Sequence, residues 1–76
     1  SKGNMQAIVD AALAANPQTR LCIAAIALET LQQSIAALAA HGLAAQVTQI
    51  AVSRSKAAGS LHLMMANNPV FLIVRE

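Results

Sequence analysis

An uninterrupted apolar block over residues 21–28 is the feature that most constrains how this chain folds. Eight residues are too few to cross a bilayer, since a membrane-spanning helix needs about 20 apolar residues. The block does not alternate between apolar and polar residues, and it is short for a buried helix. It therefore predicts a strand over residues 20–27 that is covered on both faces, as in a parallel sheet with packed helices.

Composition excludes several classes of protein. The chain has 76 residues, of which 57% are hydrophobic and 11% are charged, so it is not a disordered tail. The lone cysteine, Cys22, excludes an internal disulfide and a four-cysteine zinc site, and its apolar surroundings predict a core position. We expect no metal and, in the absence of a secretory signal pattern, a cytoplasmic location.

The net charge of +2 comes from scattered basic residues, and Phe71 is the lone aromatic residue. Nucleic-acid binders usually carry a dense basic stripe, often with stacking aromatic residues. We therefore expect neither nucleic acid nor a membrane as partner, and a small anionic ligand fits the modest positive charge better.

Apolar periodicity predicts two helices. The first spans residues 5–15, with Asn4 at the N-cap, and ends before Pro17 because the residue preceding a proline avoids the helical region. The second spans residues 31–41, with Thr30 opening a capping box and a glycine closing the C-terminal end.

The C-terminal half reads as strands and turns. Alternation predicts a strand over residues 46–54, followed by a loop over 55–60 and a strand over 61–66. An Asn-Asn-Pro turn at 67–69 precedes a last strand over 70–74. The predicted order is helix, strand, helix, strand, strand, strand, which indicates an α/β fold with an antiparallel hairpin attached to a parallel sheet.

Four short motifs occur in the order and spacing of one enzyme family. They are Ala27-Leu28-Glu29-Thr30, Ile50-Ala51-Val52-Ser53-Arg54, Met64-Met65 and Asn67-Asn68-Pro69-Val70. With them, the chain resembles the decarboxylating precorrin-6B C15-methyltransferases of cobalamin biosynthesis, which are class I S-adenosylmethionine-dependent methyltransferases. Ser1-Lys2-Gly3-Asn4 is similar to the end of the small-residue turn after the fourth strand of that family.

The resemblance implies the C-terminal half of a Rossmann-like sheet, with residues 1–76 as a partial domain and the last strand antiparallel beside the family's fifth strand. The family methylates a precorrin ring and decarboxylates an acetate side chain. The sequence contains no Gly-x-Gly-x-x-Gly turn to seat the methyl donor. We therefore expect S-adenosylmethionine to serve the parent enzyme without binding this chain alone, and the chain alone to be inactive.

Ligands of open α/β sheets lie at the carboxyl ends of the strands, and three groups of residues are predicted there. Glu29 is the candidate acid–base group, and Ser1 and Gly3 are candidates for cofactor contact. The candidates for contact with the precorrin substrate are Lys2, Asn4, Thr30, Arg54, Lys56 and His62.

Structural roles remain open for several of these candidates. Asn4 and Thr30 also read as helix caps, and Glu29 as a carboxylate favoured by the helix dipole. Arg54 and Lys56 also read as solvated loop charges. A triad built on Asp10 and His41 finds no support in the sequence, because no pattern brings these residues together, and His41 is assigned no catalytic role.

A non-catalytic α/β module for oligomerisation or partner binding is the alternative function, and a small-ligand sensor is a weaker one. If both helices cover one sheet face, the other face stays bare and one edge of the 20–27 strand is open. Bare apolar faces and open edges favour self-association. We therefore expect a homo-oligomer, with the hairpin from residue 54 to 70 as a candidate contact.

Overall fold

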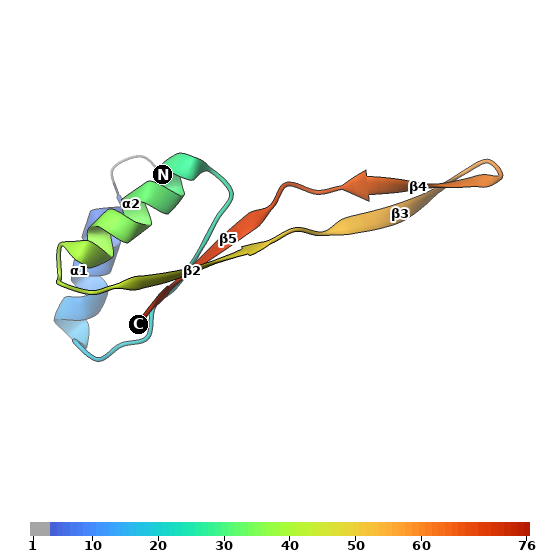
Figure 1. The fold of residues 1–76 in the computed structure, drawn as a ribbon. Helices are drawn as coiled ribbons and strands as arrows, with labels where there is room; N and C mark the ends of the chain where they lie inside the picture. The colour runs from blue at the N-terminus through green and yellow to red at the C-terminus, as the bar shows by residue number, and fades with distance from the viewer. Residues whose placement is uncertain (1–3) are drawn as a thin grey trace.

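The computed structural model describes residues 4–76, so Ser1, Lys2 and Gly3 lie outside the described residues. Residues 4–76 form two helices and five strands, which follow one another along the sequence (Figure 1). They are α1 (Met5–Ala15), β1 (Cys22–Ala25), α2 (Leu28–Ala39), β2 (Ala45–Ile50), β3 (Ser53–Ala58), β4 (Leu61–Ala66) and β5 (Val70–Arg75). Within this described part, neither helix has the length and apolar character needed to cross a membrane.

Helix α1 has the predicted bounds. It begins after Asn4 and ends at Ala15, and the following Asn16 has an extended φ of −154°, as expected for the residue before Pro17. The predicted closure of the second helix by Gly42 is also confirmed, because this residue adopts a left-handed φ of 70°. The amide of Leu43 then donates to the carbonyl of Leu38 at 3.0 Å, which caps the helix end.

The predicted start of the second helix is wrong. Helix α2 begins at Leu28 after an extended Ala27, whose carbonyl accepts a hydrogen bond from the amide of Leu31 at 3.1 Å. Thr30 therefore lies inside the first turn and does not cap the helix. The cause is the short β1, which ends at Ala25 and leaves room for an earlier helical turn.

The last strand is antiparallel and lies in the middle of a three-stranded sheet. Strand β5 pairs with β1 on one side and with β2 on the other, antiparallel to both. The register sets Ile23 of β1 and Val47 of β2 opposite Ile73. The antiparallel last strand and the open edge of β1 are as predicted.

Both helices cover the same face of this sheet. One core joins both helices to the strands β1 and β5. Its buried members are Val9, Leu13, Ala25, Ala37, Leu38 and Ile73. Helices and core thus occupy one side, as expected from a repeated winding.

The other sheet face has no helix over it in residues 4–76. Because side chains alternate between faces, Cys22 and its paired neighbour Val74 point away from the helices, and both are exposed. The prediction that the 20–27 strand is covered on both faces is therefore wrong, and so is the core position of Cys22.

The two helices and the three-stranded sheet form the body of the molecule. Strands β3 and β4 form a hairpin that projects far from this body (Figure 1). We call residues 53–66 the arm, and every one of them is exposed. The molecule measures 56 × 23 × 17 Å as a result. The predicted loop over 55–60 is wrong: strand continues to Ala58, and only Gly59 and Ser60 turn.

The turn explains how the strand can continue so far. Ala58 pairs with Leu61, which leaves a two-residue loop, and Gly59 has a φ of 63° whereas Ser60 has no positive φ. A positive φ at the first loop position alone is the pattern of a type II′ turn, which matches the twist of paired strands.

An irregular step separates the arm from the three-stranded sheet. Ile50 pairs with Val70, whereas Ser53 pairs with Ala66. Two residues therefore face three, which is a bulge. The longer side holds Asn67, Asn68 and Pro69, and a proline is tolerated there because it has no amide hydrogen to donate to a ladder.

Candidate functional site

Two predicted site residues lie at the carboxyl edge of the sheet, where β1 and β2 end. Because both strands are antiparallel to β5, they run parallel and end at the same edge. Helix α2 begins directly after β1, so exposed Glu29 and half-buried Thr30 lie in the first helical turn at this edge. Glu29 also lies where the helix dipole favours a negative charge.

A shallow hollow joins the start of α1 to α2. Its volume is about 190 Å³, and its lining residues are Met5, Gln6, Gln33 and Ala36. Asn4 directly precedes this lining, and Thr30 lies one turn before Gln33. The hollow therefore lies between the first turn of α1 and the middle of α2.

The three remaining described candidates lie on the arm. Arg54 is four residues beyond the end of β2, or about 13 Å at roughly 3.3 Å per strand residue, and Lys56 is farther still. His62 pairs with Ala57, so it points to the opposite arm face from Arg54 and Lys56. The structure therefore separates these three residues from Glu29, and it does not gather them into one cluster.

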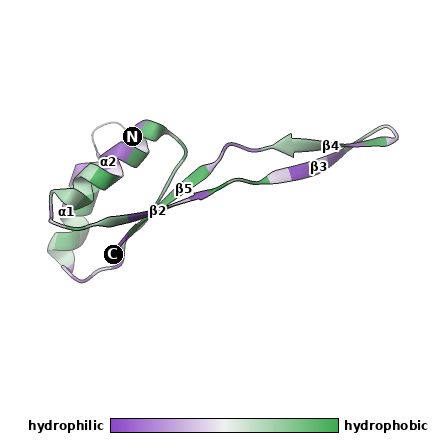
Figure 2. Cartoon of the chain, in the orientation of Figure 1, coloured by the Kyte–Doolittle hydropathy of each residue, from purple (hydrophilic) through white to green (hydrophobic). Residues whose placement is uncertain are grey.

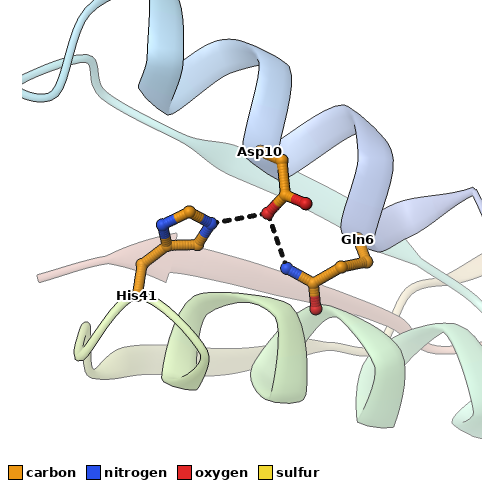
Figure 3. A network of polar contacts seen from close by, with 3 residues as sticks. All are labelled: Gln6, Asp10 and His41. Carbon is orange, nitrogen blue, oxygen red and sulfur yellow. Dashed lines mark hydrogen bonds and ion pairs between the residues drawn. The ribbon is translucent and has the colours of Figure 1, made fainter.

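Sequence reasoning missed a polar network between the helices. Oδ1 of Asp10 accepts a hydrogen bond from Nε2 of Gln6 at 2.7 Å and lies 2.6 Å from Nε2 of His41 (Figure 3). The Gln6–Asp10 spacing of four residues is typical of a helix face. His41 is 31 residues away from Asp10, and no local pattern announces that contact.

This network ties α1 to the segment after α2. The hydrogen bonds from Gln6 and His41 hold the pKa of Asp10 below its usual 3.8. All three side chains lie at the surface, and their contacts link α1 to His41, which follows the end of α2. Among residues 4–76, no group of three or more His, Cys, Asp or Glu side chains is placed to hold a metal ion.

The lowered pKa of Asp10 predicts a pH-dependent contribution to stability. The contribution is present above the unfolded pKa and is lost as the pH falls through the folded pKa. We expect Asp10→Asn to unfold at lower urea than the wild type at about pH 6, with the difference vanishing by about pH 2. Glu76→Gln, a change at an exposed carboxylate at the chain end, is the control. The same pH-dependent loss in both variants would contradict the role of the network.

Comparison with known proteins shows which solved structures share this fold. No protein-family model matches the sequence, and no curated protein matches it significantly. A precorrin-8W decarboxylase from Methanobacterium thermoautotrophicum matches 97% of the chain with a TM-score of 0.86 and 28% identity. A precorrin-6y C5,15-methyltransferase from Geobacter metallireducens matches 100% of the chain with a TM-score of 0.84 and 26% identity.

A third solved structure agrees with these two. It is a domain from Corynebacterium diphtheriae described as a precorrin-6Y C5,15-methyltransferase, and it matches 72% of the chain with a TM-score of 0.59 and 25% identity. The chain spans 40% and 39% of the length of the first two structures.

The described residues thus have a mixed α/β fold of the kind found in methyltransferase enzymes. More narrowly, the structural neighbours are precorrin methyltransferases and a precorrin decarboxylase, so the resemblance inferred from the four sequence motifs is confirmed.

Proposed function

We propose that the chain forms the substrate-side, C-terminal half of a class I S-adenosylmethionine-dependent methyltransferase. In this proposal the enzyme methylates carbon 15 of a precorrin ring and decarboxylates an acetate side chain in cobalamin biosynthesis. The observation that carries the proposal is the match of 97% and 100% of the chain, at TM-scores of 0.86 and 0.84, to two precorrin enzymes.

The described residues do not fit a seat for the methyl donor. The glycines among them are Gly42, which ends α2, and Gly59, which turns the arm, so neither forms a phosphate- or nucleotide-binding turn at the carboxyl edge. S-adenosylmethionine would supply an electrophilic methyl group when bound to the rest of the enzyme. The contribution of this chain is therefore to place and orient the acceptor ring.

Glu29 is the residue in this chain best placed to act on the substrate. Its carboxylate is exposed at the carboxyl edge, where ligands of open α/β sheets bind. From this position it can hold a proton or orient a polar ring substituent, with Thr30 beside it. Precorrin rings carry many carboxylates, and Arg54 and Lys56 offer charge-assisted hydrogen bonds for such groups on the arm.

A hybrid enzyme tests this function. In it, the chain replaces the matching segment of the Geobacter precorrin methyltransferase. We expect the hybrid to bind S-adenosylhomocysteine and to methylate the precorrin substrate. A folded hybrid that binds S-adenosylhomocysteine but does not methylate the ring would overturn the proposal. It would favour the alternative, a non-catalytic module, for which the exposed arm is the supporting observation.

Within the hybrid, Glu29→Gln is expected to lower kcat at least tenfold, because the amide cannot exchange a proton. Glu76→Gln is the matched control, since it makes the same change to an exposed carboxylate at the end of β5, away from the carboxyl edge. If both variants turn over equally and Glu29→Gln only lowers the melting temperature, Glu29 serves the helix dipole alone.

A further inference from the structure

Another hollow lies at the amino edge of the sheet, where β1 and β2 begin and β5 ends. This edge is opposite to the carboxyl edge that holds Glu29. Figure 2 shows the hydrophilic end of the chain, marked C, beside the loop that joins α1 to β1, and the hollow is formed by these two segments. Its volume is about 280 Å³, and we call it the amino-edge hollow. Its lining residues are Gln18, Thr19, Arg20, Arg75 and Glu76.

The guanidinium of Arg75 is held in place by the loop. Its Nη1 donates to the carbonyl of Pro17 at 2.6 Å and to the carbonyl of Thr19 at 2.9 Å. The loop is itself folded by local hydrogen bonds, since the amide of Thr19 donates to the carbonyl of Asn16 at 3.0 Å. The half-buried Arg75 is therefore ordered by folding, so a ligand that binds it does not have to immobilise it.

The opposite edge of this guanidinium has unused donors. Both hydrogens of Nη1 are engaged by the two carbonyls, whereas Nε and Nη2 have no hydrogen-bond partner within residues 4–76. The Nε–Nη2 edge is a planar fork that matches the two oxygens of a carboxylate. Exposed Arg20 likewise has no hydrogen bond or ion pair in the described part of the chain. Two guanidinium groups with unused donors therefore line the same hollow.

Charge and size indicate which anion fits. The lining carries the two positive charges of Arg20 and Arg75 and the negative charge of Glu76, and the excess of one charge matches a monocarboxylate. A phosphate group, with a charge of about −1.5 to −2, is repelled more strongly by Glu76. The volume has room for about nine water molecules, which is the size of a small organic acid.

We propose that the amino-edge hollow binds the carboxylate of a small monocarboxylic acid, with the Nε–Nη2 edge of Arg75 as the bidentate donor and Arg20 as the second cation. The uncharged side chains of Gln18 and Thr19 can donate to a polar substituent of the same ligand. The site lies at the edge opposite to Glu29, so it stands whether or not the chain takes part in methyl transfer.

An NMR titration with sodium lactate at neutral pH tests the proposal on the whole chain. Lactate replaces sodium chloride at constant ionic strength, so that charge screening stays the same and chloride serves as the reference anion. We expect a saturable shift of the Nε–Hε signal of Arg75 and of the backbone amides of residues 18–21. Sodium phosphate, titrated in the same way, is expected to bind with a dissociation constant at least threefold higher than that of lactate.

Two arginine variants separate a local site from the effect of net charge. Arg20→Met is expected to raise the dissociation constant of lactate at least fivefold, because a charge-assisted hydrogen bond is lost. Arg54→Met removes the same charge on the arm, and we expect it to leave the dissociation constant within about twofold of the wild type. Far-UV circular dichroism verifies that both variants keep the fold.

Several results would overturn the proposal. They are a linear, unsaturated shift of the Arg75 signal with lactate, phosphate binding as tight as or tighter than lactate binding, and a loss of affinity in Arg54→Met as large as in Arg20→Met. An Arg20→Met variant that binds lactate as tightly as the wild type would also overturn it.

Discussion

Replacing Ile73 by alanine is expected to lower the free energy of unfolding by about 3–5 kcal/mol, the largest effect of any change considered for this chain. Ile73 is fully buried in the central strand β5, opposite Ile23 on one side and Val47 on the other. Both helices pack on its face of the sheet. Truncation therefore opens a cavity where all the layers of the body meet.

The size of this loss is large relative to the stability of a small chain. Stabilities of about 0.05–0.15 kcal/mol per residue give roughly 4–11 kcal/mol for a chain of this length. We therefore expect Ile73→Ala to be partly unfolded at 25 °C, as measured by urea titration with circular dichroism. Val74→Ala is the control, because Val74 is the next residue on β5 but points to the uncovered face and is 38% exposed. A loss in Val74→Ala as large as in Ile73→Ala would mean that the core is not where the structure places it.

Replacing Arg75 by methionine is expected to lower the free energy of unfolding by about 2–3 kcal/mol. Nη1 of Arg75 donates to the carbonyl of Pro17 at 2.6 Å and to the carbonyl of Thr19 at 2.9 Å. Its backbone amide also donates to the carbonyl of Leu21 at 3.1 Å. The side chain of Arg75 thus fastens the loop between α1 and β1 to the end of the central strand.

A second arginine in that loop provides the comparison for Arg75. Arg20→Met makes the same change of charge at an exposed position. We expect it to change the free energy of unfolding by less than about 0.5 kcal/mol, as surface substitutions usually do. If Arg20→Met and Arg75→Met were equally destabilising, net charge would account for the loss, and the two hydrogen bonds to carbonyls would not.

The helices and the last strand were predictable because local chemistry determines them. The apolar periodicity of α1 and the proline after it mark both ends of that helix, and Gly42 marks the end of α2. The start of α2 was not predictable, because Thr30 is a good cap by residue type. The length of β1, set by its pairing with β5, decides where the helix begins.

The arm was missed for a related reason. Lysine, alanine and serine have weak strand propensity, so residues 55–58 read as a loop. Their pairing partners on β4 hold them in a strand, and that pairing is not visible in β3 alone. The sequence therefore predicted a more compact candidate site than the structure has. Glu29 and Thr30 lie at the predicted edge, whereas Arg54, Lys56 and His62 lie on the arm, away from it.

The bulge beside Pro69 decides which side chains of β4 share a face with the basic residues of β3. Without the bulge, and with the same residues present, the register of β2 and β5 would continue into the arm and shift each β3 residue by one position along β4. Lys56 would then sit across from Met64 in place of Leu63, and Arg54 across from Ala66 in place of Met65. The one unmatched residue thus acts as a phase shift in the ribbon, which places Leu63 on the face of Arg54 and Lys56, and His62 on the opposite face.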